Sequence, residues 1–197
     1  MTPRPAVFLD RDGVLVHDRG YLVSVDELDV MPGVPAAMRS LGDAGFRLVV
    51  VTNQAVVARG MIDEPALAAI HAALEAQLRE AGAPPLDAVF ACPHHPDAFV
   101  EAYRIACDCR KPRPGSLRRA AGELGIDLTA SFMVGDRPSD ILAGKRAGCR
   151  TVLIDGPHRH DPAIIASDPP EEAEPDHVAT DLTAAAAWIL AARGSTE

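Results

Sequence analysis

The chain has 197 residues, enough for one domain with a sizeable hydrophobic core and too few for two full domains. Hydrophobic residues make up 48% of it and charged residues 24%, as in an ordinary globular protein. The formal net charge of -9 and the aromatic content of 4% argue against a broad nucleic-acid-binding surface, so an anionic ligand would need a local cluster of cations.

Signals for membrane insertion or export are not expected in this sequence. Its apolar stretches fall short of the roughly 20 residues needed to cross a bilayer, and the apolar run before Asp10 is too brief for a signal peptide. We therefore expect a cytoplasmic monomer with neither membrane nor nucleic-acid partners.

Short, nearly continuous apolar segments alternate with helical patterns along the chain. This alternation predicts β-α units around a parallel sheet whose two faces are both covered, a doubly wound Rossmann-like α/β fold in a single domain over residues 1–197. Strands are expected at Ala6–Asp10, Arg47–Thr52, Ala88–Cys92, Phe132–Asp136 and Thr151–Asp155, with a weaker sixth near His177–Ala179.

Helices are expected between these strands. The segment Val34–Ala44 is followed by Gly45, a typical helix stop, and Asp63 is placed to cap a helix with an apolar stripe that ends near Gly82. The other expected helices are Ser116–Leu124, Ser139–Ala147 and the Ala-rich segment AAAAWILAA near the C-terminus. Two segments have no such pattern and are expected to be loops, one at residues 93–114 and an acidic, Pro-rich one at about 156–176.

Polar side chains follow three of the predicted strands. Asp10 and Asp12 come after the first strand, Thr52 ends the second, and Asp136 and Asp140 follow the fourth. Ligands of open parallel sheets bind outside the carboxyl ends of the strands, so these side chains are expected in one crevice. A lone Asp after a strand is more often a turn or helix-cap residue. Polar residues of complementary chemistry at the ends of three strands argue against a purely structural role for all of them.

Together these groups predict metal-dependent phosphoryl chemistry. Carboxylates gathered at one point need a cation among them, and oxygen ligands suit Mg²⁺. Asp10 is a candidate nucleophile that forms an aspartyl-phosphate, and Asp12 is placed to protonate the leaving oxygen and later deprotonate water. Thr52 and Lys111 are expected to hold the phosphoryl oxygens.

Four segments in this order, FLDRDGV, VVVTNQ, RKPRPG and MVGDRPSD, resemble the four motifs of the haloacid dehalogenase-like superfamily. The resemblance implies Asp10 as nucleophile and Asp12 as general acid and base. It also implies Mg²⁺ held by the Asp10 carboxylate, the Asp12 backbone carbonyl and Asp136, phosphoryl contacts from Thr52 and Lys111, and a supporting role for Asp140.

A cysteine cluster lies in the first predicted loop. Cys92, His94, Cys107 and Cys109 form the pattern C-x-H-x12-C-x-C, which predicts a closed structural Zn²⁺ site in a loop at about residues 92–109. His95 is an alternative ligand to His94, and free buried thiols with a surface histidine are the non-metal alternative. Because this loop runs into Arg110 and Lys111, zinc is expected to fix the backbone that carries these cations.

The chain resembles capless members of the superfamily with such a zinc loop, the D-glycero-D-manno-heptose 1,7-bisphosphate 7-phosphatases. The resemblance runs from about Ala6 to Leu153 and includes the segments HDRGY, ARG, CPHHPD and CDCRKP. It implies a phosphorylated sugar as substrate, with Arg110 or Arg59 contacting a second phosphate. The implied substrate-facing residues are Asp18, Arg19, Gly20, Tyr21, Asn53, Gln54, Arg59 and Arg110. Val14, Ala55-Val56 and Arg137 depart from the family pattern, which affects the choice of substrate more than the reaction type.

Three alternatives remain. Histidinol-phosphate phosphatases share the four motifs and the zinc loop, so another small phosphorylated metabolite is a second candidate substrate. A zinc-ribbon module that binds nucleic acid or protein is a candidate of a different class, and the net charge of -9 argues against the nucleic acid. An inactive scaffold is the third, although every phosphoryl-transfer position is filled.

Overall fold

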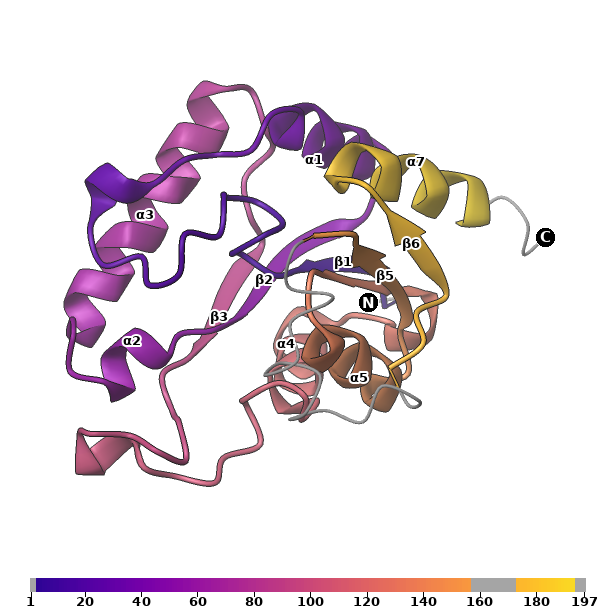
Figure 1. Cartoon of the computed structure of the whole chain (residues 1–197). Helices are drawn as coiled ribbons and strands as arrows, with labels where there is room; N and C mark the ends of the chain where they lie inside the picture. Colours follow the sequence, from indigo (N-terminus) through magenta and orange to yellow (C-terminus); the bar gives the residue numbers. More distant parts are fainter. Residues whose placement is uncertain (1–2, 157–172, 194–197) are drawn as a thin grey trace.

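The structure is a computed structural model that describes residues 3–156 and 173–193. Six parallel strands form one sheet in the order β3-β2-β1-β4-β5-β6, with the first strand of the chain in the middle (Figure 1). The strands are β1 (Ala6–Leu9), β2 (Arg47–Asn53), β3 (Ala88–Cys92), β4 (Phe132–Gly135), β5 (Arg150–Ile154) and β6 (His177–Ala179). All six predicted strands are present, with ends that differ from the prediction by one residue at most.

Alternate residues of each strand enter different cores, as the two-residue period of a strand requires. Along β1, Val7 and Leu9 join one hydrophobic cluster, whereas Ala6 and Phe8 join the other. All four β1 side chains are fully buried, which explains why the sequence of this strand is continuously apolar.

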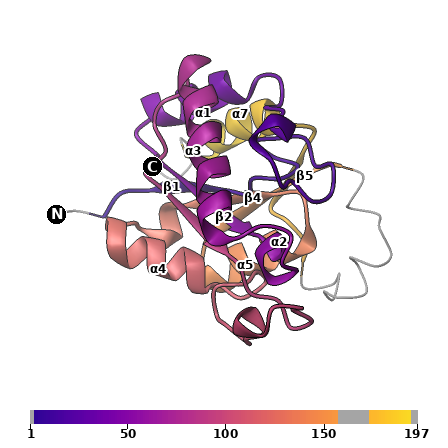
Figure 2. The same cartoon turned by 90° about the vertical axis from the view of Figure 1, so that its left-hand side faces the viewer.

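The helices cover both faces of the sheet, and Figures 1 and 2 agree on which face each one covers. One face carries α1 (Val34–Asp43), α3 (Glu64–Glu80) and α7 (Leu182–Arg193), and the other carries α4 (Gly115–Leu124) and α5 (Pro138–Ala147). The predicted helix start and stop signals are present. The Asp63 carboxylate accepts a hydrogen bond from the Ala66 N–H (2.8 Å), and Gly45 follows the end of α1 with φ of 87°.

Short elements were not predicted from the sequence. They are α2 (Ala55–Ala58) and three 3-10 turns, η1 (Val25–Glu27), η2 (Glu101–Tyr103) and η3 (Leu128–Ala130). A single turn is too short to show a helical period, so the pattern of apolar residues does not reveal it. The predicted loop 93–114 contains only η2, whereas most of the predicted acidic loop, residues 157–172, lies outside the described residues.

The connections at the carboxyl ends of the strands position the site. Residues 10–33 follow β1, α2 follows β2, and the cysteine-containing loop follows β3 and lies against α2 through η2. Within residues 3–156 and 173–193, these connections form no separate cap domain over the strand ends. No helix in this part of the chain is long and apolar enough to span a membrane.

Candidate active site

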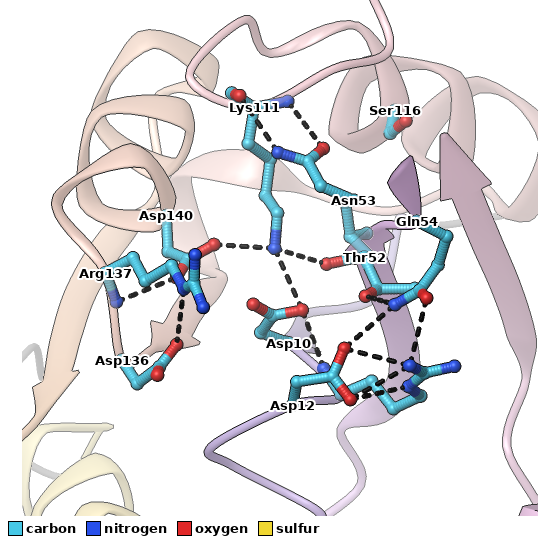
Figure 3. A network of polar contacts seen from close by, with 12 residues as sticks. Asp10, Asp12, Thr52, Asn53, Gln54, Lys111, Ser116, Asp136, Arg137 and Asp140 are labelled. Carbon is cyan, nitrogen blue, oxygen red and sulfur yellow. Dashed lines mark hydrogen bonds and ion pairs between the residues drawn. The ribbon is translucent and has the colours of Figure 1, made fainter. Parts of the chain in front are cut away.

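Lys111 lies at the centre of a buried network of charged groups (Figure 3). Its ammonium Nζ is 3.0 Å from Asp10 Oδ1 and 2.6 Å from Asp140 Oδ1, and it donates to the Val51 carbonyl at 2.8 Å. Burial opposes the charge of Lys111, but the two carboxylates raise its pKa above the ordinary value. Lys111 is therefore a fixed cation beside the Asp10 carboxylate.

Asp136 has a buried carboxylate without hydrogen-bond partners. Its side chain is 2% exposed, and neither carboxylate oxygen accepts a hydrogen bond from the described residues. The Nε of Arg137 is 3.9 Å from Oδ1, too far for a hydrogen bond. Burial, together with the charges of Asp140 and Asp10, raises the pKa of Asp136 to about 8. A buried carboxylate of this kind calls for a cation or a proton.

Two glycines allow the carboxylates to approach the backbone this closely. A Cβ on Gly13 would lie 2.4 Å from Asp136 Oδ2, and the φ of Gly13 is 74°, in the left-handed region. A Cβ on Gly135 would lie 2.2 Å from the Cβ of Asp140. Residues with side chains at either position would therefore displace a carboxylate of the site.

The three carboxylates fit a divalent cation. Asp10, Asp136 and Asp140 each offer one oxygen, and these oxygens lie within 4.8 Å of one another. Hard oxygen ligands of this kind suit Mg²⁺. The Asp12 side chain does not belong to this group.

The Asp12 side chain instead faces Gln54 and Arg11. Gln54 Nε2 donates to Asp12 Oδ2 (2.9 Å) and to Thr52 Oγ1 (2.8 Å), which links the two predicted catalytic side chains. Burial raises the pKa of Asp12, and the Arg11 guanidinium opposes this shift. Asp12 thus retains a proton more readily than an exposed aspartate, as a general acid must.

Asp10, Asp12, Lys111 and Asp140 line a cavity of about 580 Å³. Nearly all of the predicted substrate-facing residues line this cavity: Asp18, Gly20, Tyr21, Asn53, Gln54, Arg59 and Arg110. Arg19 does not, because its side chain is 71% exposed and pairs with Asp29 at 2.5 Å. His95, one of the two candidate zinc ligands, also lines the cavity.

Asn53 uses its side chain to hold Lys111. The Asn53 amide Nδ2 donates to the Lys111 carbonyl, and its Oδ1 accepts from the Lys111 N–H, both at 3.0 Å. Lys111 and Asn53 are far apart in sequence, so this pair joins the end of β2 to the loop before α4. Asn53 therefore fixes the backbone of the cation, and it keeps one amide hydrogen and one oxygen lone pair for a ligand in the cavity.

Two further cations face the cavity. The guanidinium of Arg59 lies over the rings of Tyr21 and Phe99, at 5.3 and 5.9 Å from their centroids, and its buried Nε has no hydrogen-bond partner in the described part of the chain. Arg110 donates from Nη1 to the His94 carbonyl at 3.1 Å. Arg59 and Arg110 therefore bring local positive charge to a cavity whose lining also includes five aspartates.

The four predicted zinc ligands converge. Cys92, Cys107, Cys109 and His94 bring their ligand atoms within 4.8 Å of one another, whereas His95 turns away and accepts a hydrogen bond from the Asp97 N–H. The Sγ atoms of Cys92 and Cys107 are 3.6 Å apart, near the edge of about 3.8 Å that a tetrahedral zinc site with 2.3 Å bonds has. The Sγ atom of Cys109 lies 3.1 Å from the Sγ atoms of both Cys92 and Cys107. These distances are shorter than the tetrahedral edge, but they are far longer than a disulfide bond. The set fits a closed zinc site.

Some groups of the site were not predicted from the sequence. Arg11 is 1% exposed and contacts Asp12, and Arg137 donates to Asp18 across the cavity at 2.8 Å. A charged residue between two motif aspartates, directly after an apolar strand, is a signal that could have identified Arg11. The Arg137–Asp18 pair has no such signal, because it joins residues 119 positions apart.

Comparisons with known proteins identify relatives of this chain. A family model described as HAD-hydrolase-like matches residues 108–185. Curated D-glycero-β-D-manno-heptose-1,7-bisphosphate 7-phosphatases from Photorhabdus laumondii and Escherichia coli K12 are 45% and 43% identical to this chain over 150 residues, 76% of this chain and 79% and 78% of theirs.

A solved structure of a heptose bisphosphate phosphatase has a similar fold. The crystal structure of D,D-heptose 1,7-bisphosphate phosphatase from B. bronchiseptica, complexed with magnesium and phosphate, is 34% identical, with a TM-score of 0.79 over 95% of this chain and 99% of that one. Sequence identity above 40% over most of both chains, together with this shared fold, places the chain in the D-glycero-β-D-manno-heptose-1,7-bisphosphate 7-phosphatase family of haloacid dehalogenase-like phosphatases.

Proposed function

We propose that this chain removes the 7-phosphate of D-glycero-β-D-manno-heptose 1,7-bisphosphate by way of a phosphorylated Asp10. The observation that carries the proposal is the buried Asp10–Lys111 pair beside the unpartnered Asp136 carboxylate, with Asp10 and Lys111 lining a cavity that Arg59 and Arg110 also line. The relatives named above supply the identity of the sugar and its β anomer.

In the first step, Asp10 attacks the phosphorus atom of the 7-phosphate. The bond from phosphorus to the sugar oxygen breaks, and this oxygen takes the proton of the Asp12 carboxyl group. The Lys111 ammonium balances the charge of the phosphoryl oxygens, and the Thr52 hydroxyl donates a hydrogen bond to one of them. Mg²⁺, held by Asp10, the Asp12 carbonyl and Asp136, would offset the repulsion between the attacking carboxylate and the phosphate. Asp140 supports the site by holding Lys111 at 2.6 Å.

In the second step, water attacks the phosphorus atom of the phosphorylated Asp10. The Asp12 carboxylate takes the proton of this water, and the bond between phosphorus and Asp10 breaks. Inorganic phosphate leaves, Asp10 is again a carboxylate, and Asp12 is again protonated. The two steps therefore return both side chains to their starting states.

The zinc loop has a supporting role in this proposal. Cys92, His94, Cys107 and Cys109 would hold a structural zinc ion that takes no part in the chemistry, since four protein ligands leave no open position. The hydrogen bond from Arg110 to the His94 carbonyl supports the idea that zinc fixes the position of Arg110.

Phosphate release by the purified magnesium-loaded protein tests the function. We expect the β-heptose bisphosphate to give the highest kcat/KM, above its α anomer and histidinol phosphate, with the product retaining the 1-phosphate in a ³¹P spectrum. Asp10→Asn should lower kcat by about 10³-fold or more, because it removes the nucleophile. Asp43→Asn, the same chemical change at an exposed position, is the control. A preference for histidinol phosphate would overturn the heptose assignment, and full turnover by the Asp10 variant would overturn the mechanism.

Arg59 is the candidate partner of the second phosphate. Its guanidinium is held between two aromatic rings at the rim of the cavity and makes no ion pair within the described residues, so its charge is available to an anion. Arg59→Met should raise KM for the heptose 1,7-bisphosphate by about tenfold, the loss of one charge-assisted contact. The same change should leave KM for heptose 7-phosphate, which lacks the 1-phosphate, nearly unaltered. Equal increases for both substrates would contradict the assignment.

A further inference from the structure

Arg11 is a buried cation that lies in the sequence between Asp10, the proposed nucleophile, and Asp12, the proposed acid. Its side chain is 1% exposed, and its guanidinium contacts Asp12 through two atoms. Nε donates to Asp12 Oδ1 at 3.0 Å, and Nη2 donates to Asp12 Oδ2 at 2.9 Å. A fork of this kind fixes the plane of a carboxylate, which a single ammonium cannot do.

Gln54 completes the hold on the same carboxylate. Its Nε2 donates to Asp12 Oδ2 at 2.9 Å and to Thr52 Oγ1 at 2.8 Å, and its Oε1 accepts from Arg11 Nη2 at 2.9 Å. Gln54 is 2% exposed, so this amide is almost fully committed to groups of the protein. Both oxygens of Asp12 thus accept hydrogen bonds from donors that are themselves fixed.

The far side of Arg11 is anchored to α3. Its Nη1 lies 3.3 Å from Nε2 of His71. Burial and the Arg11 charge lower the pKa of His71 to about 4, so the ring is neutral and presents an acceptor to the guanidinium. All three guanidinium nitrogens are therefore used, and the position of Arg11 is determined by Asp12 after β1, Gln54 after β2 and His71 in α3.

We propose that Arg11 and Gln54 are positioning residues for the proton transfers of Asp12, an inference that rests on the proposed function. They hold the Asp12 carboxyl group in one orientation beside Thr52 and Asp10 while it first gives and then takes a proton. Arg11 also balances the negative charge that Asp12 bears between the two steps. Neither residue is needed to bind the phosphoryl group, which Lys111 and Thr52 contact.

This role predicts a dependence on the leaving group that a structural role would not produce. The sugar oxygen is a poor leaving group and needs the proton of Asp12, whereas 4-nitrophenolate leaves without one. Steady-state turnover does not separate the two cases, because the later hydrolysis of phosphorylated Asp10 uses Asp12 for every substrate. The first turnover does separate them. Its rate is measured at high enzyme concentration as the rate of the initial burst of 4-nitrophenolate or of sugar product.

The test compares these first-turnover rates in the magnesium-loaded protein for Arg11→Lys, which keeps the charge and loses the fork. We expect a loss of about 10- to 100-fold with heptose bisphosphate and less than about threefold with 4-nitrophenyl phosphate, since general acid catalysis contributes about 10²- to 10⁴-fold. Gln54→Leu should show the same pattern more weakly, and it carries the test if circular dichroism shows that Arg11→Lys does not fold. An equal loss for both substrates, or no loss for either, would overturn the inference.

Two further variants make the result specific. Asp12→Asn sets the benchmark: if it slows both substrates equally, the acid role in the proposed function fails, and if it is selective while Arg11→Lys is not, only the positioning role fails. His71→Leu removes the anchor on α3 and leaves the Arg11–Asp12 contacts in place. It is expected to lower the thermal unfolding temperature and to slow both substrates by the same factor, the signature of a structural contribution. A selective loss in His71→Leu would show that the contacts between Arg11 and Asp12 alone do not position the acid.

Discussion

At the scale of single residues, Asp136 has the most unusual environment in the site. Its carboxylate is buried between two other carboxylates and lacks a hydrogen-bond donor among the described residues. Without a metal ion, such a group is more stable with a proton than without one, and its pKa rises to about 8 from an ordinary value of 3.8. Proton and Mg²⁺ therefore compete for the same oxygens.

This competition predicts the pH dependence of stability. Between pH 3.8 and about 8, the folded metal-free protein holds a proton that the unfolded chain has lost, so its free energy of unfolding falls as the pH rises. The slope between pH 7 and 8 is at most about 1.4 kcal/mol per pH unit. Urea unfolding in EDTA should show this fall, saturating Mg²⁺ should flatten it, and Asp136→Asn should lack it. The raised pKa of Asp136 would be contradicted if the free energy of unfolding of the wild type in EDTA rose across this pH interval and that of Asp136→Asn rose in the same way.

At the scale of elements, the cysteine-containing loop connects the four proposed zinc ligands to the cavity and to α4. The Arg110 guanidinium donates to the His94 carbonyl, and the Ser116 hydroxyl donates to the Cys109 carbonyl at 3.0 Å. Gly115 allows the start of α4 to approach the loop, because a Cβ there would lie 2.3 Å from the Asp108 carbonyl oxygen. The geometry of Arg110 thus depends on the loop remaining folded around its ligands.

Removal of one zinc ligand tests this dependence. Cys109→Ser should weaken zinc binding by more than about 100-fold, because even outer-shell changes at metal sites cost about 10- to 100-fold. Zinc content by mass spectrometry should fall from one per chain, and KM for the heptose bisphosphate should rise more than KM for 4-nitrophenyl phosphate. Cys149→Ala is the control, since this buried cysteine lies apart from the cluster and the variant should keep its zinc. Full zinc content in Cys109→Ser would contradict the assigned ligand set.

At the scale of the whole molecule, the alternation of apolar and helical segments was sufficient to predict the fold. Continuous apolar runs identified the strands, and glycine or Asp63 marked the helix ends, because these signals are local in sequence. The meeting of Asp10, Asp136 and Asp140 also followed from the sequence, since parallel topology places their strand ends at one edge.

The detailed contacts of the site could not be predicted in the same way. Asn53 was expected to face the sugar and does line the cavity, but the sequence did not indicate that its amide also holds the backbone of Lys111, 58 residues further along. Arg19 was expected in the cavity, but it points to solvent and pairs with Asp29. Such outcomes depend on side-chain orientation and on partners distant in sequence, which periodicity does not encode.

The central position of β1 has a consequence for how the chain folds. β1 is synthesised before the other five strands of the sheet, yet its neighbour β4 follows only after more than a hundred further residues, as the hydrogen bond from Ala6 N–H to Ser131 Oγ, 125 positions apart, illustrates. Pairing over such a distance requires the closure of a long loop, which slows folding. The middle of the sheet therefore forms late in synthesis, and until then the most apolar strand of the chain has a free edge that a chaperone or another nascent chain could cover.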